Sequence, residues 1–189
     1  GGEKFSLTVT SYLNLYANLK RGKTKWVNNL DLFYAIQRTT SLGMRKNDDR
    51  IDLYSKYTHQ LSEKWSFGAV GNFRTQFTDG YDYSKTPRLR ISDLFAPAYL
   101  TLASGFEYTP SDAFSVFMSP VSARWTFVKD DADNLGPRYG LDPGKTSRFE
   151  LGAFLSANYK KDIAKNISFK SRLDLYSNYL KNPQNVDIF

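Results

Sequence analysis

The chain contains no cysteine and only one histidine, His59, among its 189 residues. Disulfides and thiolate metal sites are therefore excluded, and most zinc sites and Ser-His-Asp triads lack the residues they need. Long apolar runs are also missing, since no stretch approaches the roughly 18–20 residues of a transmembrane helix. The mean hydropathy of −0.51 alone indicates a soluble protein. That average cannot detect membrane β-strands, whose lumen-facing residues dilute the apolar ones.

Aromatic and basic residues, by contrast, are abundant. The chain has 13 Tyr, 14 Phe and 3 Trp, and its formal net charge is +7. A length of 189 residues fits one domain most simply. Because the sequence has no initiator Met and enters a strand pattern almost at once, we expect a processed or trimmed product. Residues 1–189 are thus predicted to form a single domain that is incomplete at one or both ends.

The first clear pattern is a strict alternation over residues 5–20. One face carries Phe5, Leu7, Val9, Ser11, Leu13, Leu15, Ala17 and Leu19, and the other carries Ser, Thr, Tyr, Asn and Lys side chains. A period of two predicts a β-strand with one apolar and one polar face. Strands in globular proteins usually span only about 5–6 residues, so the length of this one needs an explanation.

The same pattern recurs along the chain. Seven further segments alternate over residues 23–39, 50–61, 64–78, 98–108, 113–128, 147–161 and 166–180. No segment shows a helical period, so the sequence predicts an all-β fold of eight antiparallel strands joined as hairpins. The alternation is irregular before Pro120, where we expect a bulge or bend.

The connections between these segments alternate in length. Residues 21–24, 62–63, 109–112 and 162–165 are short turns, whereas 40–49, 79–97 and 129–146 are long. Short turns at one end and long loops at the other are typical of outer-membrane barrels. A soluble lipocalin-like barrel also alternates, with its apolar side inward, and has no general reason for this asymmetry in its connections.

Two further features favour the membrane. Most predicted strands have 11–17 residues, enough for the roughly 9–11 that cross a bilayer. Aromatic residues on the apolar face lie near strand ends, as in the girdles of membrane barrels; they are Phe5, Trp26, Trp65, Phe77, Tyr108, Trp125, Tyr159 and Tyr179. We therefore predict an antiparallel up-and-down transmembrane β-barrel in a bacterial outer membrane. A soluble β-barrel or sandwich is the alternative.

Four sequence blocks support this reading: RKNDDRIDLYSKY (45–57), FRTQFTDGYDYS (73–84), ISDLFAPAYLTLASGFEYTPSD (91–112) and SPVSARWTFV (119–128). In identity, order and spacing they resemble a Bacteroidetes outer-membrane family catalogued as a domain of unknown function. The resemblance covers most of the chain and implies a β-barrel with no assigned activity, cofactor or catalytic residue. Members typically have further strands on both sides, which implies a complete barrel of ten to twelve strands.

The polar face carries charges of both signs. They are Asp31, Arg50, Asp52, Lys56, Arg74, Glu107, Arg124, Arg148, Glu150, Lys170, Arg172 and Asp174. In a barrel these side chains line the lumen, either as a selectivity lining for a small solute or as a paired network that fills a narrow interior. The near balance of signs favours the paired network.

Basic residues also gather in the predicted long loops. Arg45, Lys46, Lys85, Arg88 and Arg90 would lie at the long-loop end, where lipopolysaccharide phosphates are available. A nucleic-acid site is not expected, because no stacking motif accompanies them. The acidic runs at 47–49 and 130–134 lack the spacing of an EF-hand loop and are interpreted as solvated loop acids.

His59 is the one candidate for acid–base chemistry. It lies on the apolar register between Tyr57 and Leu61, beside a short turn, where no nucleophile or orienting partner is evident. No catalytic, cofactor-binding or metal-binding residue is therefore predicted. The expected function is a non-enzymatic barrel that stabilises the membrane or docks on other envelope proteins. Passage of a small solute is the alternative, and an outer-membrane hydrolase comes third.

Overall fold

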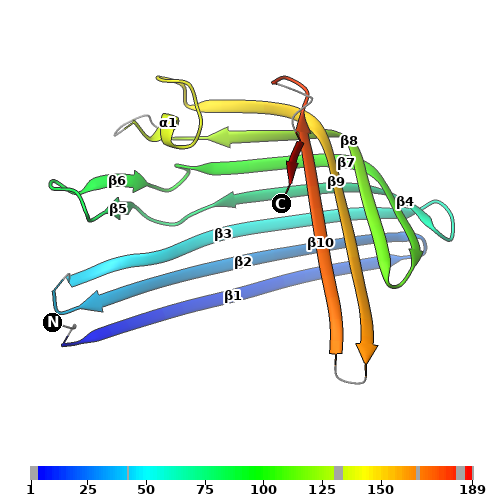
Figure 1. Cartoon of the computed structure of the whole chain (residues 1–189), viewed down its shortest axis with the longest axis horizontal. Helices are drawn as coiled ribbons and strands as arrows, with labels where there is room; N and C mark the ends of the chain where they lie inside the picture. Colours follow the sequence, from blue (N-terminus) through cyan, green and yellow to red (C-terminus); the bar gives the residue numbers. More distant parts are fainter. Residues whose placement is uncertain (1–3, 42, 130–133, 165–166, 182–185, 189) are drawn as a thin grey trace.

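Nine strands form one antiparallel sheet that curls over a hollow (Figure 1). The computed structural model describes residues 4–41, 43–129, 134–164, 167–181 and 186–188. Neighbours in the sheet follow one another in the chain, apart from one small hairpin inserted between β4 and β7. The strands are β1 (Ser6–Arg21), β2 (Thr24–Thr39), β3 (Gly43–Gln60), β4 (Trp65–Thr75), β7 (Ala98–Ser111), β8 (Phe114–Phe127), β9 (Ser147–Ala164), β10 (Ile167–Asn178) and β11 (Val186–Ile188).

This topology confirms the all-β, antiparallel up-and-down prediction, and all eight long strands form. Residues 40–49 were predicted to be a long loop, which is wrong, because β3 begins at Gly43. The loop predicted over 79–97 contains the two-stranded hairpin β5 (Gly80–Asp82) and β6 (Leu89–Ser92). A single helical turn, α1 (Leu135–Arg138), lies in the connection from β8 to β9. The short strand β11 was not anticipated.

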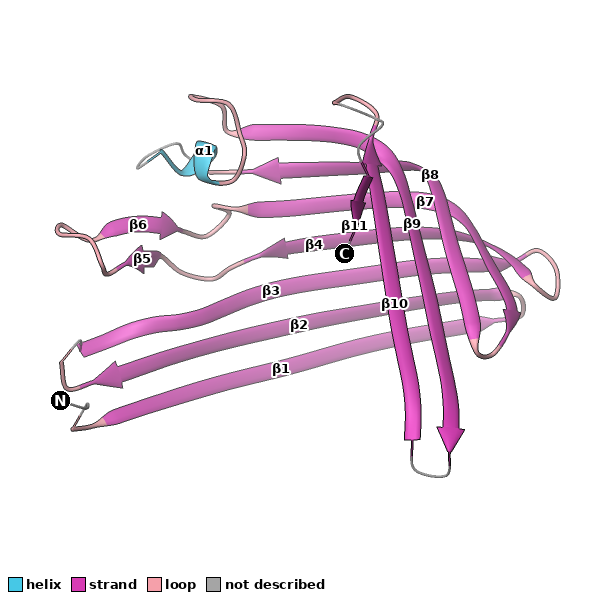
Figure 2. Ribbon diagram, viewed as in Figure 1, coloured by secondary structure: helices cyan, strands magenta, loops and turns pink. Residues whose placement is uncertain are grey.

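A bulge in β8 disturbs its pairing with both neighbouring strands. The β7–β8 register shifts between Ser104 and Phe106, and the β8–β9 register shifts between Ser119 and Ser122. This places the bulge at Pro120, as predicted. Gly105 lies opposite it, where a Cβ atom would come within 2.0 Å of the Met118 carbonyl oxygen. The close approach therefore requires glycine, and β8 and β9 bend sharply part-way along their length (Figure 2).

Contacts across the sheet identify its concave face. Lys56 on β3 pairs with Glu107 on β7 although β4 lies between these strands, with Nζ 2.9 Å from a carboxylate oxygen. The same ammonium group lies 5.7 Å from the ring centre of Phe117 on β8. Strands two places apart in a flat sheet are separated by roughly 9–10 Å, so side chains meet across them where the sheet curves inward. The polar face is therefore the concave one.

The convex face is apolar and largely exposed. Along β1 the outward side chains of Leu7, Val9, Leu13 and Leu15 are each about half exposed. Many large apolar side chains on the outward face of the other long strands are also exposed. Buried apolar side chains form a small cluster at the long-loop end: Ala96, Val128, Leu135 and Leu141, with Tyr139 packed against it. On the concave side, Phe117 and Tyr176 are also buried and line the groove among its charged residues.

Among the described residues, no helix has the length and apolar character needed to span a bilayer.

The two sides of the sheet, which end in β1 and in the three-residue β11, are not joined to each other in the described part of the chain. β1 pairs only with β2, and β10 pairs with β9 along its length and with β11 at Leu175–Ser177. Figure 1 shows β1 and β10 on opposite sides of the hollow. The sheet described here is therefore an open arch.

Candidate functional site

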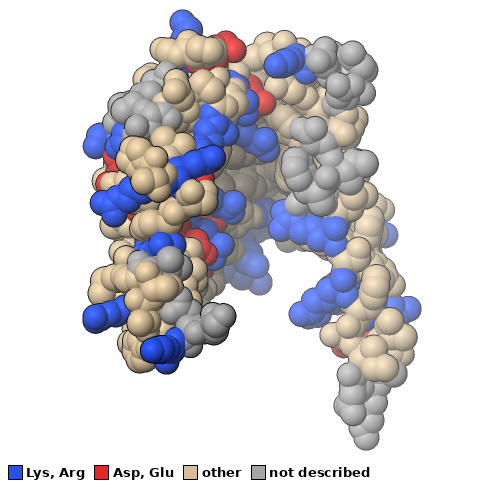
Figure 3. All heavy atoms as spheres, turned by 60° about the vertical axis from the view of Figure 1, so that its left-hand side comes forward, with Lys and Arg blue, Asp and Glu red and all other residues tan. Residues whose placement is uncertain are grey.

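The concave face forms a polar groove that runs across the sheet. Its volume is about 770 Å³, and residues of β2, β3, β4, β7, β8, β9 and β10 line it. The space-filling view shows Lys and Arg side chains gathered around the inside of the hollow (Figure 3). The predicted lumen residues that line the groove are Asp31, Asp52, Lys56, Arg74, Glu107, Arg124 and Arg172.

Ion pairs neutralise much of this charge. Both carboxylate oxygens of Glu107 accept from Lys56 Nζ, at 2.9 and 3.0 Å. Asp52 accepts from Arg74 at 2.8 Å and from the side-chain amide of Asn72 at 2.6 Å. The Lys56–Glu107 pair is well shielded from solvent, with side-chain exposures of 23 % and 19 %. Two of the predicted lumen acids are thus paired with two of the predicted lumen cations.

Asp31 is held by neutral donors instead of a cation. Its carboxylate accepts from the Tyr12 hydroxyl at 2.5 Å and from the Asn14 amide at 2.8 Å. The Asn29 amide donates to its second oxygen at 2.7 Å. Because Tyr12 and Asn14 belong to β1 and Asp31 to β2, this cluster ties the outer strand of the sheet to its neighbour.

The other predicted lumen charges have different environments. Arg148 pairs with Glu150 at 3.0 Å near the long-loop end, and the Arg124 guanidinium lies 4.7 Å from the ring centre of Tyr176. Arg50 is exposed on β3, and Lys170 is exposed on β10. The side chain of Asp174 lies outside the described part of the chain.

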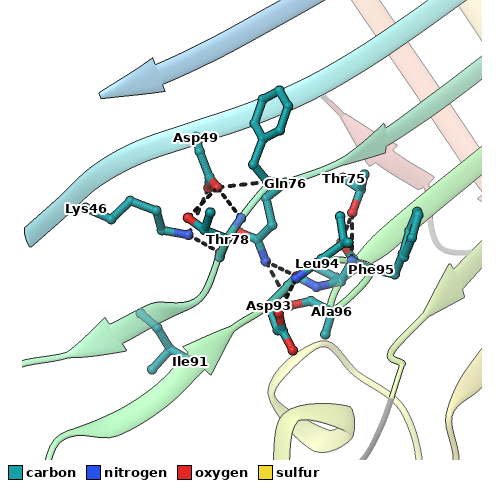
Figure 4. Close-up of polar contacts among 12 residues, drawn as sticks. Lys46, Asp49, Thr75, Gln76, Thr78, Ile91, Asp93, Leu94, Phe95 and Ala96 are labelled. Atoms are coloured by element: carbon teal, nitrogen blue, oxygen red, sulfur yellow. Dashed lines mark hydrogen bonds and ion pairs between the residues drawn. The ribbon is translucent and has the colours of Figure 1, made fainter. Parts of the chain in front are cut away.

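Asp49 organises the long-loop end of the sheet (Figure 4). Its side chain is 2 % exposed, and one oxygen accepts from the backbone N–H groups of Phe77 and Thr78, both at 2.9 Å. The other oxygen accepts from Lys46 Nζ at 2.9 Å, and that ammonium also donates to the Thr78 carbonyl oxygen at 2.6 Å. Asp49 was interpreted as a solvated loop acid, which is wrong. The pairing of β4 with β3 ends at Thr75. Beyond that point, the Asp49 carboxylate is the acceptor for the N–H groups of Phe77 and Thr78.

The segment that follows is fixed by side-chain hydrogen bonds to its backbone. The Gln76 amide donates to the carbonyl oxygens of Asp93 and Ala96, at 2.9 and 2.8 Å. The Thr75 hydroxyl donates to the Pro97 carbonyl at 3.1 Å and accepts from the Phe95 N–H at 3.2 Å. Sequence patterns did not reveal this network, because each side-chain group bonds to a backbone group that only the fold brings within reach.

The five basic residues predicted at this end divide into two groups. Lys46 is bound to Asp49, and Arg90 pairs with Asp93 at 3.1 Å, so both support the loop fold. The other three are Arg45, Lys85 and Arg88. The guanidinium of Arg45 stacks on Tyr83 at 4.1 Å and that of Arg88 on Tyr81 at 4.5 Å, and Lys85 is exposed.

Tyrosines at the long-loop end have raised pKa values. Tyr81 donates to the Asp79 carboxylate at 3.1 Å, and this hydrogen bond to an anion raises the pKa of the Tyr81 hydroxyl. Burial raises the pKa of Tyr139, whose hydroxyl donates to the Ile91 carbonyl at 2.7 Å. Both phenols therefore stay neutral donors at physiological pH, and Tyr139 joins the connection after β8 to strand β6.

The predicted girdle residues lie at two levels of the convex face. At the short-turn end the Trp65 and Tyr108 rings are 4.7 Å apart, and those of Tyr159 and Phe169 are 6.1 Å apart. Trp26, at the same end, donates to the Ser55 hydroxyl at 2.9 Å. Near the long-loop end the ring contacts are Trp125 with Phe149 and Phe77 with Tyr34. The Tyr179 hydroxyl donates at 3.0 Å to the carbonyl of Pro120, which lies half-way along β8.

His59 lies at the short-turn end of β3, as predicted. Its Nδ1 is 3.1 Å from the Thr24 hydroxyl oxygen across the β2–β3 pair. Among the described residues, no group of three or more His, Asp or Glu side chains is placed to hold a metal ion. Of the second acidic run, residues 130–133 lie outside the described part of the chain.

Comparison with protein families adds one finding. Residues 1–81 match the family model described as "Protein of unknown function (DUF3078)". The match spans β1 to β4 and reaches the start of the β5–β6 hairpin. The match agrees with the resemblance to a domain of unknown function. The description of the family names no activity. Neither a curated protein nor a solved structure matches the chain.

The Asp49 network makes a direct prediction about the segment from 76 to 97. Asp49→Ala leaves the Phe77 and Thr78 N–H groups without their acceptor, at about 1–3 kcal/mol for each unsatisfied group. We expect faster amide hydrogen exchange at both positions and faster proteolysis within this segment. Asp48→Ala is the matched control, because Asp48 is exposed and is not part of the network. Equal exchange in the two variants would show that Asp49 does not hold the segment.

Proposed function

We propose that this protein is a non-enzymatic β-barrel of a Gram-negative outer membrane with a structural or protein-interaction role. The observation that carries the proposal is the sidedness of the sheet, which is charged on its concave face and apolar on its convex face. A soluble lipocalin-like barrel has the opposite arrangement, because its apolar residues fill the interior. An apolar convex face matches the lipid-facing surface of a membrane barrel. The two levels of aromatic residues match the two interfaces of a bilayer.

A membrane location also requires the arch to close. Every backbone polar group in hydrocarbon needs a partner, so the free edges of β1 and β10 cannot face lipid. Strands β1 and β11 run in the same direction, because eight antiparallel steps separate them. Only an odd number of further strands can then join them with antiparallel pairs, and the smallest closed barrel has ten. We propose that strands beyond these 189 residues complete a barrel of ten to twelve.

The structural role is favoured over transport by the ion pairs of the groove. Lys56–Glu107 and Arg74–Asp52 fill the concave side with charges that are already neutralised. Small barrels have interiors that side chains just fill. The loops at the long-loop end are fixed by Asp49 and Gln76. They offer a rigid surface on which other envelope proteins can dock. A solute channel is the second candidate, because the groove still has a volume of about 770 Å³.

Charge substitutions on the two faces test the membrane proposal. Leu13→Arg places a cation at mid-strand on the convex face, and we expect a loss of about 2–4 kcal/mol in folding stability in lipid vesicles. Tyr16→Arg, on the concave face of the same strand, is the control and should change stability by only about 0.5 kcal/mol. Urea titrations of the vesicle-bound protein measure both. Equal, small effects would indicate that water covers both faces and would contradict the proposal.

Planar-bilayer recordings on the unsubstituted protein separate the two candidate roles. A neutralised, filled interior predicts no reproducible conductance. A stable open channel would favour the transport role and leave the membrane location intact.

We also propose that Arg45, Lys85 and Arg88 contact lipopolysaccharide phosphates. Cation–π contacts with Tyr83 and Tyr81 position two of these cations, Arg45 and Arg88, at the long-loop end. We expect the double variant Lys85→Gln, Arg88→Gln to bind lipid A more weakly in reconstituted protein. Lys64→Gln, at the short-turn end, is the control of matched chemistry. Unchanged lipid A binding in the double variant would overturn this proposal.

A further inference from the structure

The outward face of β1, β2 and β3 changes character at the level of Tyr34. Residues paired across neighbouring strands share a face, so the register defines which side chains lie together on it. Toward the long-loop end, at and beyond Tyr34, this face carries Asp49, Lys46 and Arg38. Between Trp26 and Tyr34 the outward positions of these three described strands carry no charge; they are Leu13, Leu15, Ala17, Asn28, Leu30, Leu32, Ile51, Leu53 and Ser55.

This change marks where the hydrocarbon of a bilayer would end. The stretch from Trp26 to Tyr34 spans roughly 27 Å of strand at about 3.4 Å per residue. A tilt of about 35–45° reduces its height to roughly 20 Å, comparable to the apolar band of about 25 Å in membrane barrels. Charged side chains on the lipid face are destabilising within that band. In a membrane barrel, the part of β1 to β3 beyond Tyr34 therefore lies outside the hydrocarbon.

Apolar side chains nevertheless continue on this face beyond the boundary. Figure 1 shows the ends of β1 to β3 extending well past the end of β4. Arg38 is flanked there by its register partners Leu7 and Met44, and Val9 is paired with Ile36. The side chains of Leu7, Val9 and Met44 are each more than half exposed. Contiguous apolar side chains in water are typical of protein interaction sites. We call this surface the projecting patch; it consists of Phe5, Leu7, Val9, Ile36, Arg38 and Met44.

Arg38 defines the chemistry of a partner for the projecting patch. Its side chain is exposed, and none of the described carboxylates forms an ion pair with it. Lys46, on the border of the patch, is already bound to Asp49. None of the residues of the patch is acidic. A second copy of the chain, related by a twofold axis, would bring Arg38 close to its own counterpart and would supply no carboxylate.

We propose that the projecting patch binds a different envelope protein, through an apolar surface of that protein with an Asp or Glu carboxylate at its centre. A carboxylate can accept two parallel hydrogen bonds from the Arg38 guanidinium. The surrounding apolar side chains would exclude water from this ion pair, as near-neutral contacts do around interface hot spots. Met, Arg and aromatic residues are also the types enriched at interface cores. This inference rests on the proposed docking role and names the surface and the partner's chemistry.

Photo-crosslinking in intact cells that carry the full chain tests the projecting patch, with a diazirine amino acid in place of Leu7 or Met44. We expect both positions to give an adduct with the same protein, and the cross-linked peptide to contain an Asp or Glu. A synthetic copy of that peptide should bind the wild-type protein in vesicles. Arg38→Glu should weaken this binding roughly tenfold or more, because it brings two carboxylates together. Arg38→Lys keeps the positive charge and should bind the peptide more tightly than Arg38→Glu does.

Two control positions separate this inference from the proposed function. The crosslinker in place of Thr8, on the opposite face of β1, should not give the adduct, whereas in place of Leu15 it should give lipid adducts, also in the Arg38→Glu variant. Lipid adducts at positions 7 and 44 would show that the bilayer covers the patch and would contradict the docking surface alone. Adducts with the same chain, no adduct, or peptide binding that Arg38→Glu leaves unchanged would also overturn the inference. Failure to obtain lipid adducts at Leu15 would instead contradict the membrane location.

Discussion

The antiparallel hydrogen-bond register is the constraint on which the rest of the structure depends. Each long strand keeps its apolar side chains on one face because successive residues alternate and the register holds neighbouring strands in step. Curling the sheet then brings the polar face inward, where Lys56 reaches Glu107 across an intervening strand. The apolar face is left outside, with far more large hydrophobic side chains exposed than buried. The apolar convex face, the charged concave face and the groove all follow from this one pattern.

The two ends of the arch differ in their side-chain contacts and charges. At the long-loop end, Asp49 and Gln76 satisfy backbone groups that no strand pairs, and a small apolar cluster around Leu135 packs beside them. The described part of this end is therefore held by specific contacts, although it is built largely from connecting segments. At the short-turn end, Lys160 and Lys170 face each other across the β9–β10 pair, and Glu107 and Asp112 line the same opening.

The sequence predicted the strands where alternation is unbroken and missed structure where it is not. Residues 5–20 predicted β1 almost to the residue. The start of β3 was missed because Asn47 is an extra residue in the pair with β2, and a one-residue bulge exchanges the two faces. The charged residue types of the groove were predicted, but the pairing of Lys56 with Glu107, 51 residues apart, depends on the curl. The Asp49 network had no sequence signal, because its partners are backbone N–H groups.

The absence of cysteine allows the central claim to be tested residue by residue. Single cysteines introduced along β7 can each carry a fluorophore in protein reconstituted into vesicles. Quenching is then measured with brominated lipid chains and with aqueous iodide. The account predicts quenching by lipid at the convex positions Leu100, Leu102 and Phe106, and by iodide at the concave positions Thr101, Ala103 and Glu107. Iodide quenching at both sets alike would contradict a convex face in contact with lipid.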